Sequence, residues 1–210
     1  MNILFNFQNR LKEYKLVREE LDTSKINLKF VTFLSLSTML ATLGLLSNNT
    51  PVLVGSMLIA PLISITVAFG VGISLLNKKL ILTSISTLIV GSVISIMLST
   101  LLVFLLPHQV DSIAIAERFN ANLVTFLVAI ISGLAAGLIL IWKKEVQVVA
   151  GASIATTLIP PLAATGIAIS TLHTSVAIST IYMYILNLIG VIIGAIISFY
   201  FSLPVEQSKK

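Results

Sequence analysis

The chain has 210 residues, of which 57% are hydrophobic and only 10% are charged, and its formal net charge is +5. Soluble domains carry charge on about 25% of their residues, so this chain has too little charge to cover a globule in water, and a soluble fold is excluded. It contains no cysteine, which excludes disulfides and cysteine metal sites. The composition predicts an integral membrane protein whose partner is the lipid bilayer, and we expect no cofactor, no metal and no nucleic acid.

Residues 1–28 form the first predicted element, a cytoplasmic amphipathic helix. Its apolar residues recur at steps of three and four: Leu4, Phe7, Leu11, Tyr14 and Leu21. One interpretation is a helix lying on the inner leaflet, with its basic residues toward lipid headgroups. The other is a short coiled coil between subunits. We favour the first, because fewer than three heptads give a coiled coil little support.

Six apolar stretches follow, and a membrane-spanning helix needs roughly 20 such residues. They cover about 29–47, 51–76, 80–106, 122–142, 146–170 and 176–203. The polar breaks between them are mostly short, which indicates antiparallel neighbours in one bundle. We therefore predict an all-α membrane protein with six transmembrane helices over 29–203 and a cytoplasmic tail over 204–210. The loop at 107–122 connects two halves of about 29–106 and 122–203.

Lysine and arginine are distributed unevenly between the two ends of these helices. Of the 13 basic residues, twelve fall on the side that both termini share, and Arg118 alone falls on the other side. Basic residues accumulate in cytoplasmic loops. Both termini are therefore predicted to be cytoplasmic.

An internal repeat relates the two halves. The segment "VTFL" begins at Val31 and again at Val124, and "LIAPL" from Leu58 recurs as "LIPPL" from Leu158. Because each half has three crossings, the second half must insert upside down relative to the first. The sequence thus predicts two inverted three-helix repeats with a pseudo-two-fold axis in the membrane plane.

Prolines fall in the middle of the second and fifth spans, at Pro61 and at Pro160 and Pro161. A proline in a helix interior costs about 3 kcal/mol, and the carbonyls it leaves unpaired need partners that lipid does not offer. Paired interruptions in two inverted halves are typical of a transporter binding site. The candidate substrate-binding residues are Ser56, Pro61, Ser64, Thr66, Thr156, Thr157, Pro160, Pro161, Thr165 and Asn187. Asn187 is either a site ligand or an amide that bonds a neighbouring helix.

Two glycine motifs, "GLAAG" from Gly133 and "GVIIG" from Gly190, fit the small-xxx-small pattern of closely packed membrane helices. In a six-helix chain we expect them to close contacts within the molecule rather than to mediate dimerisation. A homo-oligomer is nevertheless expected, since 22.6 kDa is small for a complete permeation unit.

The proline segments also carry a family resemblance. "VGSMLIAPLISITVAFGVGI" (Val54 to Ile73) and "ATTLIPPLAATGIAI" (Ala155 to Ile169) resemble the two signature segments of a bacterial and archaeal membrane family called domain of unknown function 389. The resemblance covers roughly residues 30–203. It implies a multi-pass protein of the prokaryotic inner membrane and names no substrate.

The chemistry available in the spans narrows the function. No acid lies within an apolar run and no lysine or arginine lies near a midplane, which argues against a carboxylate-based proton or sodium site. No catalytic set of residues occurs there, so we expect no enzyme. Half-helix N-termini at the prolines would present positive partial charge. The prediction is a transporter or channel for a small neutral or anionic solute. The alternative is a non-transporting membrane scaffold whose prolines serve only packing.

Overall fold

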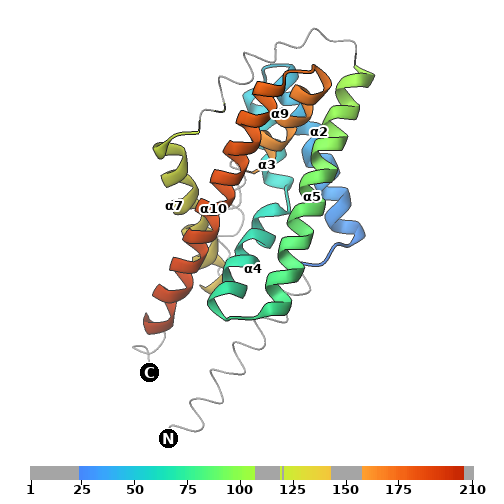
Figure 1. Cartoon of the computed structure of the whole chain (residues 1–210). Coiled ribbons are helices and arrows are strands. Elements are labelled where there is room, and N and C mark those ends of the chain that lie inside the picture. The colour runs from blue at the N-terminus through green and yellow to red at the C-terminus, as the bar shows by residue number, and fades with distance from the viewer. Residues whose placement is uncertain (1–23, 107–118, 120, 143–157, 206–210) are drawn as a thin grey trace, which may run out of the picture.

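The computed structural model describes residues 24–106, 119, 121–142 and 158–205. Within these residues the protein consists of seven α-helices without a strand (Figure 1). They are α2 (Leu28–Leu46), α3 (Thr50–Ile59), α4 (Leu62–Ser74), α5 (Lys78–Leu105), α7 (Leu123–Trp142), α9 (Ile159–Ser170) and α10 (Thr174–Val205). The all-helical prediction is confirmed for this part of the chain. The predicted amphipathic helix, the connection between the halves and the C-terminal tail fall largely outside the described residues.

Asparagine side chains define where four of the helices begin. Asn27, Asn49, Asn77 and Asn122 each accept a hydrogen bond from the backbone N–H three residues later, at distances between 2.7 and 3.2 Å. Each bond satisfies one of the N–H groups that a helix start leaves without an intrahelical partner. The short polar breaks of the sequence therefore act as helix caps.

Three of the described helices are long and apolar enough to cross a bilayer: α2, α5 and the part of α10 from Thr174 to Tyr200. The pair α3 and α4 passes the same test together and is bent by 49° at its break. Shorter apolar helices cover Leu123–Leu138 and Ile159–Ser170. The described residues thus have the character of a helical membrane protein, and the count of six crossings stays a prediction.

The two longest helices, α5 and α10, run along the bundle in opposite directions (Figure 1). The shorter α4 begins near the middle of the bundle and runs to the end where α5 starts, whereas α9 begins near the middle and runs to the end where α10 starts. Both α4 and α9 pack against α5 and α10, and α9 also packs against α2. The helix α7 packs mainly along α10.

The same tight turn joins α2 to α3, α4 to α5 and α9 to α10. In each turn one residue has a left-handed backbone: Asn48 at φ 53°, Leu76 at φ 53° and Leu172 at φ 59°. The N–H of the following residue donates to the carbonyl five residues earlier, at 2.8–2.9 Å, as in the Schellman motif. This backbone costs an L-residue other than glycine roughly 1–2 kcal/mol, and it is unusual for leucine. No residue pattern at these breaks predicts a left-handed leucine.

Glycines allow α7 and α10 to approach until their backbones touch. A Cβ at Gly133 would overlap the backbone of Val191, and one at Gly194 would overlap the backbone of Ile130. Close approach of this kind is what small residues permit in membrane helices. The prediction that the two glycine motifs pack within the chain is confirmed.

Candidate functional site

The break in the second predicted span lies between α3 and α4. The helix α3 ends at Ile59 and α4 begins at Leu62, with Pro61 as its N-terminal cap residue at φ −84° and ψ −4°. Proline has no N–H to continue the helix and its ring clashes with the preceding turn. The interruption predicted from "LIAPL" is therefore confirmed.

The second proline motif, with the pair Pro160 and Pro161, lies in the first turn of α9, which begins at Ile159. Proline is tolerated there because the first N–H groups of a helix have no intrahelical partner. Pro160 and Pro161 are both buried. The predicted ligands Thr156 and Thr157 precede this helix and lie outside the described residues.

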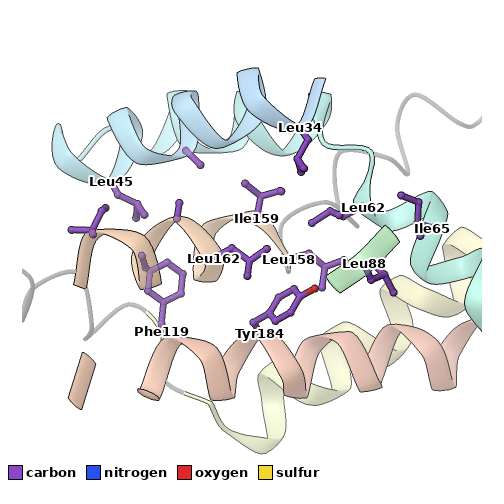
Figure 2. Close-up of a cluster of buried hydrophobic side chains, with 14 of the residues drawn as sticks. Leu34, Leu45, Leu62, Ile65, Leu88, Phe119, Leu158, Ile159, Leu162 and Tyr184 are labelled. Carbon is purple, nitrogen blue, oxygen red and sulfur yellow. The ribbon is translucent and has the colours of Figure 1, made fainter. Parts of the chain in front are cut away.

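The two helix starts meet in one buried apolar cluster, which Figure 2 shows with side chains from five helices. It includes Leu62 and Ile65 from α4, Leu158, Ile159 and Leu162 from the start of α9, Leu34 from α2, Leu88 from α5 and Tyr184 from α10. Leu62, Leu158 and Ile159 are all at most 1% exposed. The structure therefore brings the two proline motifs together, about 100 residues apart in sequence, and surrounds them with hydrocarbon side chains.

Ser56 shows how a main-chain carbonyl at the end of α3 finds a hydrogen-bond donor. The residue is fully buried, and its hydroxyl donates to the carbonyl of Leu53 at 2.6 Å. Its own carbonyl, one of the last four of α3, accepts a hydrogen bond of 2.7 Å from the hydroxyl of Ser37 on α2. A neighbouring helix thus supplies a donor that the bilayer cannot.

Two further predicted ligands, Thr66 and Thr165, are also fully buried and make equivalent bonds in the two halves. Thr66 donates to the carbonyl of Leu62 at 2.9 Å, and Thr165 donates to the carbonyl of Pro161 at 2.8 Å. Thr165 in addition shares a hydrogen bond of 2.8 Å with the hydroxyl of Thr180 on α10. Both hydroxyls are therefore engaged inside the protein.

The start of α4 differs from these sites. Ser64 is half-buried in its first turn and its side chain makes no hydrogen bond within the described residues. No side chain caps this helix, so the main-chain N–H groups of its first turn lack that kind of partner. Asn187 lies on α10, only 1% exposed, three residues after Tyr184 of the apolar cluster.

A seam of hydroxyl groups between α2, α5 and α9 was missed in the sequence. Thr38 donates to Ser95 at 3.1 Å, and Thr42 donates to Ser99 at 2.9 Å. Ser99 in turn donates to the carbonyl of Ala163 at 2.8 Å. The only sequence signal is the spacing of four residues between the hydroxyls on each helix, which places them on one face. The seam joins α2 and α5 of the first half of the chain to α9 of the second half.

The profile of the family described as "Domain of unknown function (DUF389)" matches residues 57–193, which include both proline motifs. The chain belongs to this family. An uncharacterized protein of Methanocaldococcus jannaschii, MJ0678, is 30% identical in an alignment of 190 residues that covers 88% of this chain and 59% of that protein. The chain therefore spans less than two thirds of the length of that relative. No solved structure matches the chain. The family's description states no activity, so the function rests on the site.

The polar chemistry of the described residues is restricted to hydroxyls, amides, main-chain groups, lysines and one histidine. They contain no aspartate, glutamate or arginine. They also contain no group of three or more side chains suited to holding a metal ion. Of the predicted hydroxyl ligands that the structure describes, Ser64 in the first turn of α4 is the one whose side chain makes no hydrogen bond within the described residues.

Proposed function

We propose that this DUF389 protein moves a small neutral or anionic solute across the prokaryotic inner membrane, as a transporter or channel, through the junction where α4 and α9 begin. One observation carries the proposal: two half-helices start near the middle of the bundle and run to opposite ends (Figure 1). Discontinuous helices that start at the midplane of two inverted halves are the usual setting of a transporter site.

Packing supports the inverted repeat on which this proposal depends. Each half-helix is wedged between the long helix of its own half and that of the other half. Gly70 of α4 lies against Ala195 of α10, where a Cβ would come within 2.8 Å, and Gly166 of α9 lies against Ser99 of α5, at 2.5 Å. In each contact, a glycine of the short helix in one half of the chain lies against the long helix of the other half, as an inverted repeat requires. The unusual leucine turns before α5 and α10 correspond in the same way.

We further propose six crossings, with both termini in the cytoplasm. The described residues supply α2, the α3–α4 pair, α5, α7, α9 and α10 in the order that six crossings need. The lysines at the start of α5 lie at the end of the bundle that this orientation places in the cytoplasm.

The class of solute follows from the groups at the junction. A cation would need carboxylates or a cage of carbonyl oxygens, and the described residues contain no carboxylate. The start of a helix offers N–H donors and positive partial charge. These groups suit the oxygen atoms of a neutral or anionic solute.

One set of observations favours a non-transporting scaffold as the second candidate. Ser56, Thr66 and Thr165 all make hydrogen bonds within the protein, and the helix starts are surrounded by apolar side chains. A sealed core of this kind would leave the prolines with a packing role alone. The two candidates differ in whether water and solute reach Ser64.

The experiment places single cysteines in the full chain, which has none of its own. Ser64→Cys is the test, and Thr66→Cys, fully buried half a turn further along α4, is the matched control. The protein is reconstituted in liposomes, treated with a membrane-impermeant thiol reagent, and screened for uptake of small anions and neutral metabolites. Transport predicts labelling at position 64 that a transported solute slows, with position 66 unlabelled. Absence of labelling at position 64 from both sides, together with no uptake, would establish the scaffold instead.

A further inference from the structure

The turn between α4 and α5 and the turn between α9 and α10 are built alike but end differently. Both place a leucine in the left-handed region and cap the next helix from the residue that follows. After that cap residue the first turn continues with Lys78 and Lys79, whereas the second continues with Thr174 and Ser175. Because the backbone forms without lysines at the second turn, the two lysines serve something outside the turn. The difference between the copies therefore points to a partner at one end of the bundle.

That partner carries negative charge. Lys78 and Lys79 are exposed and make no ion pair within the described residues, which contain no acidic side chain. Lys29, at the start of α2, is also exposed. The buried Ser24 places the entry to α2 beside α5, because its carbonyl accepts a hydrogen bond of 2.6 Å from the hydroxyl of Thr87. The entry to α2 therefore lies against α5, the helix that begins with Lys78 and Lys79.

The α4–α5 turn is apolar as well as basic, because Leu76 is 84% exposed. The start of α2 pairs the same residue types, with Leu28, 83% exposed, beside Lys29. Exposed leucines next to lysines match the boundary of a membrane leaflet, where apolar groups enter the acyl region and lysines stay with phosphates. A soluble anion such as free phosphate would account for the lysines but leave the leucines in water.

We propose that the α4–α5 turn binds anionic phospholipid, with Lys78 and Lys79 on the headgroup phosphate and Leu76 at the upper end of the acyl chains. The opposite turn, with Leu172 followed by His173 and hydroxyl residues, contacts its leaflet through the leucine alone. The protein therefore prefers anionic lipid on the α5-start side only. This preference is independent of whether the protein transports a solute.

The test measures lipid binding to the purified full chain in neutral detergent by native mass spectrometry. Phosphatidylglycerol and phosphatidylcholine of the same chain length are compared. A lysine near an anionic surface strengthens binding about fivefold, so Lys78→Gln with Lys79→Gln should weaken phosphatidylglycerol binding about 25-fold and leave phosphatidylcholine unchanged. The matched control is Lys209→Gln with Lys210→Gln, which removes the same charge from the C-terminal tail and should have little effect.

Further measurements distinguish binding of the lipid from binding of its headgroup alone. Leu76→Gly should weaken binding of both lipids, and glycerol phosphate, which has no acyl chain, should not compete with phosphatidylglycerol. If the Lys78/Lys79 variant fails to fold, the unmodified chain at 0.5 M salt replaces it, because screening must weaken the same contacts. Equal losses in the two double variants would overturn the proposal, as would competition by glycerol phosphate. Binding of acidic peptides at the turn in preference to lipid would also overturn it.

Discussion

Gly166→Ala is the substitution that most directly tests the packing of α9 against α5. A Cβ at position 166 would lie 2.5 Å from the Cβ of Ser99 and 2.7 Å from the carbonyl oxygen of Ile96. The second neighbour is backbone in the middle of a long helix and cannot turn away. The two helices must therefore separate, and this strains the hydrogen bonds that join them.

The size of the effect follows from three contributions. Overpacking a tight contact costs typically about 1–3 kcal/mol. Separation also stretches the bonds from Ser99 to the Ala163 carbonyl, at 2.8 Å, and from Thr100 to the Gly166 carbonyl, at 3.0 Å. Each such bond is worth about 0.6 kcal/mol in a membrane protein. Alanine returns about 0.5–1 kcal/mol through its better helix propensity. The expected net loss in free energy of unfolding is about 2–3 kcal/mol.

The assay is equilibrium unfolding of the purified protein in mixed micelles, with Gly55→Ala on α3 as the matched control. A Cβ at position 55 meets nothing within 4 Å, so that variant should gain about 0.5–1 kcal/mol from helix propensity alone. The two alanine variants should differ by about 3 kcal/mol. If Gly166→Ala were as stable as Gly55→Ala, the close contact between α9 and α5 would be wrong. The support that this contact gives to the inverted repeat would then be lost as well.

Two further substitutions test local features by the same unfolding assay. Leu172→Gly should raise the free energy of unfolding by up to about 1 kcal/mol, because relief of the left-handed backbone exceeds the entropic cost of glycine at a side chain that is 89% exposed. Leu172→Val should lower the free energy of unfolding. A loss of stability with glycine would contradict the argument that Leu172 is strained. Ser37→Ala should cost about 1–2 kcal/mol by leaving the buried Ser56 carbonyl without its donor, whereas Thr32→Ala, which removes an exposed hydroxyl bonded within its own helix, should change stability by less than about 0.5 kcal/mol.

The positions of the helix breaks could be predicted because proline acts locally. Its missing N–H and its ring kink or break a helix interior, so "LIAPL" was sufficient to predict an interruption around Pro61, where α3 ends and α4 starts. That the two glycine motifs, "GLAAG" and "GVIIG", pack within the chain was predictable for a related reason, since small residues at this spacing are typical of closely packed membrane helices. Both inferences needed the residue type and its position, and no long-range geometry.

The partners of buried hydroxyls could not be predicted in the same way. Thr66 and Thr165 were predicted as ligands because they stand near the prolines, but each of them bonds a carbonyl in its own helix, and Thr165 also shares a hydrogen bond with Thr180 of α10. The hydroxyls that reach across helices, such as Ser37 and Ser99, lie 19 and 64 residues from their acceptors. Which hydroxyl faces which carbonyl depends on the rotation of packed helices about their axes. A sequence pattern leaves that rotation undetermined.

The two proline motifs look equivalent in sequence but present different groups to the centre of the bundle. The N–H groups of the cap residue and of the first three helical residues lack intrahelical partners in any α-helix. In α9 two of these four positions are Pro160 and Pro161, which have no N–H. In α4 only one of the four positions, Pro61, lacks an N–H. The start of α9 therefore leaves fewer unpaired N–H donors among apolar side chains, and it offers a solute little to bind except apolar surface. The start of α4 keeps three N–H groups and the half-buried Ser64. A solute bound at this junction would accordingly place its acceptor oxygens on α4 and its apolar part against α9.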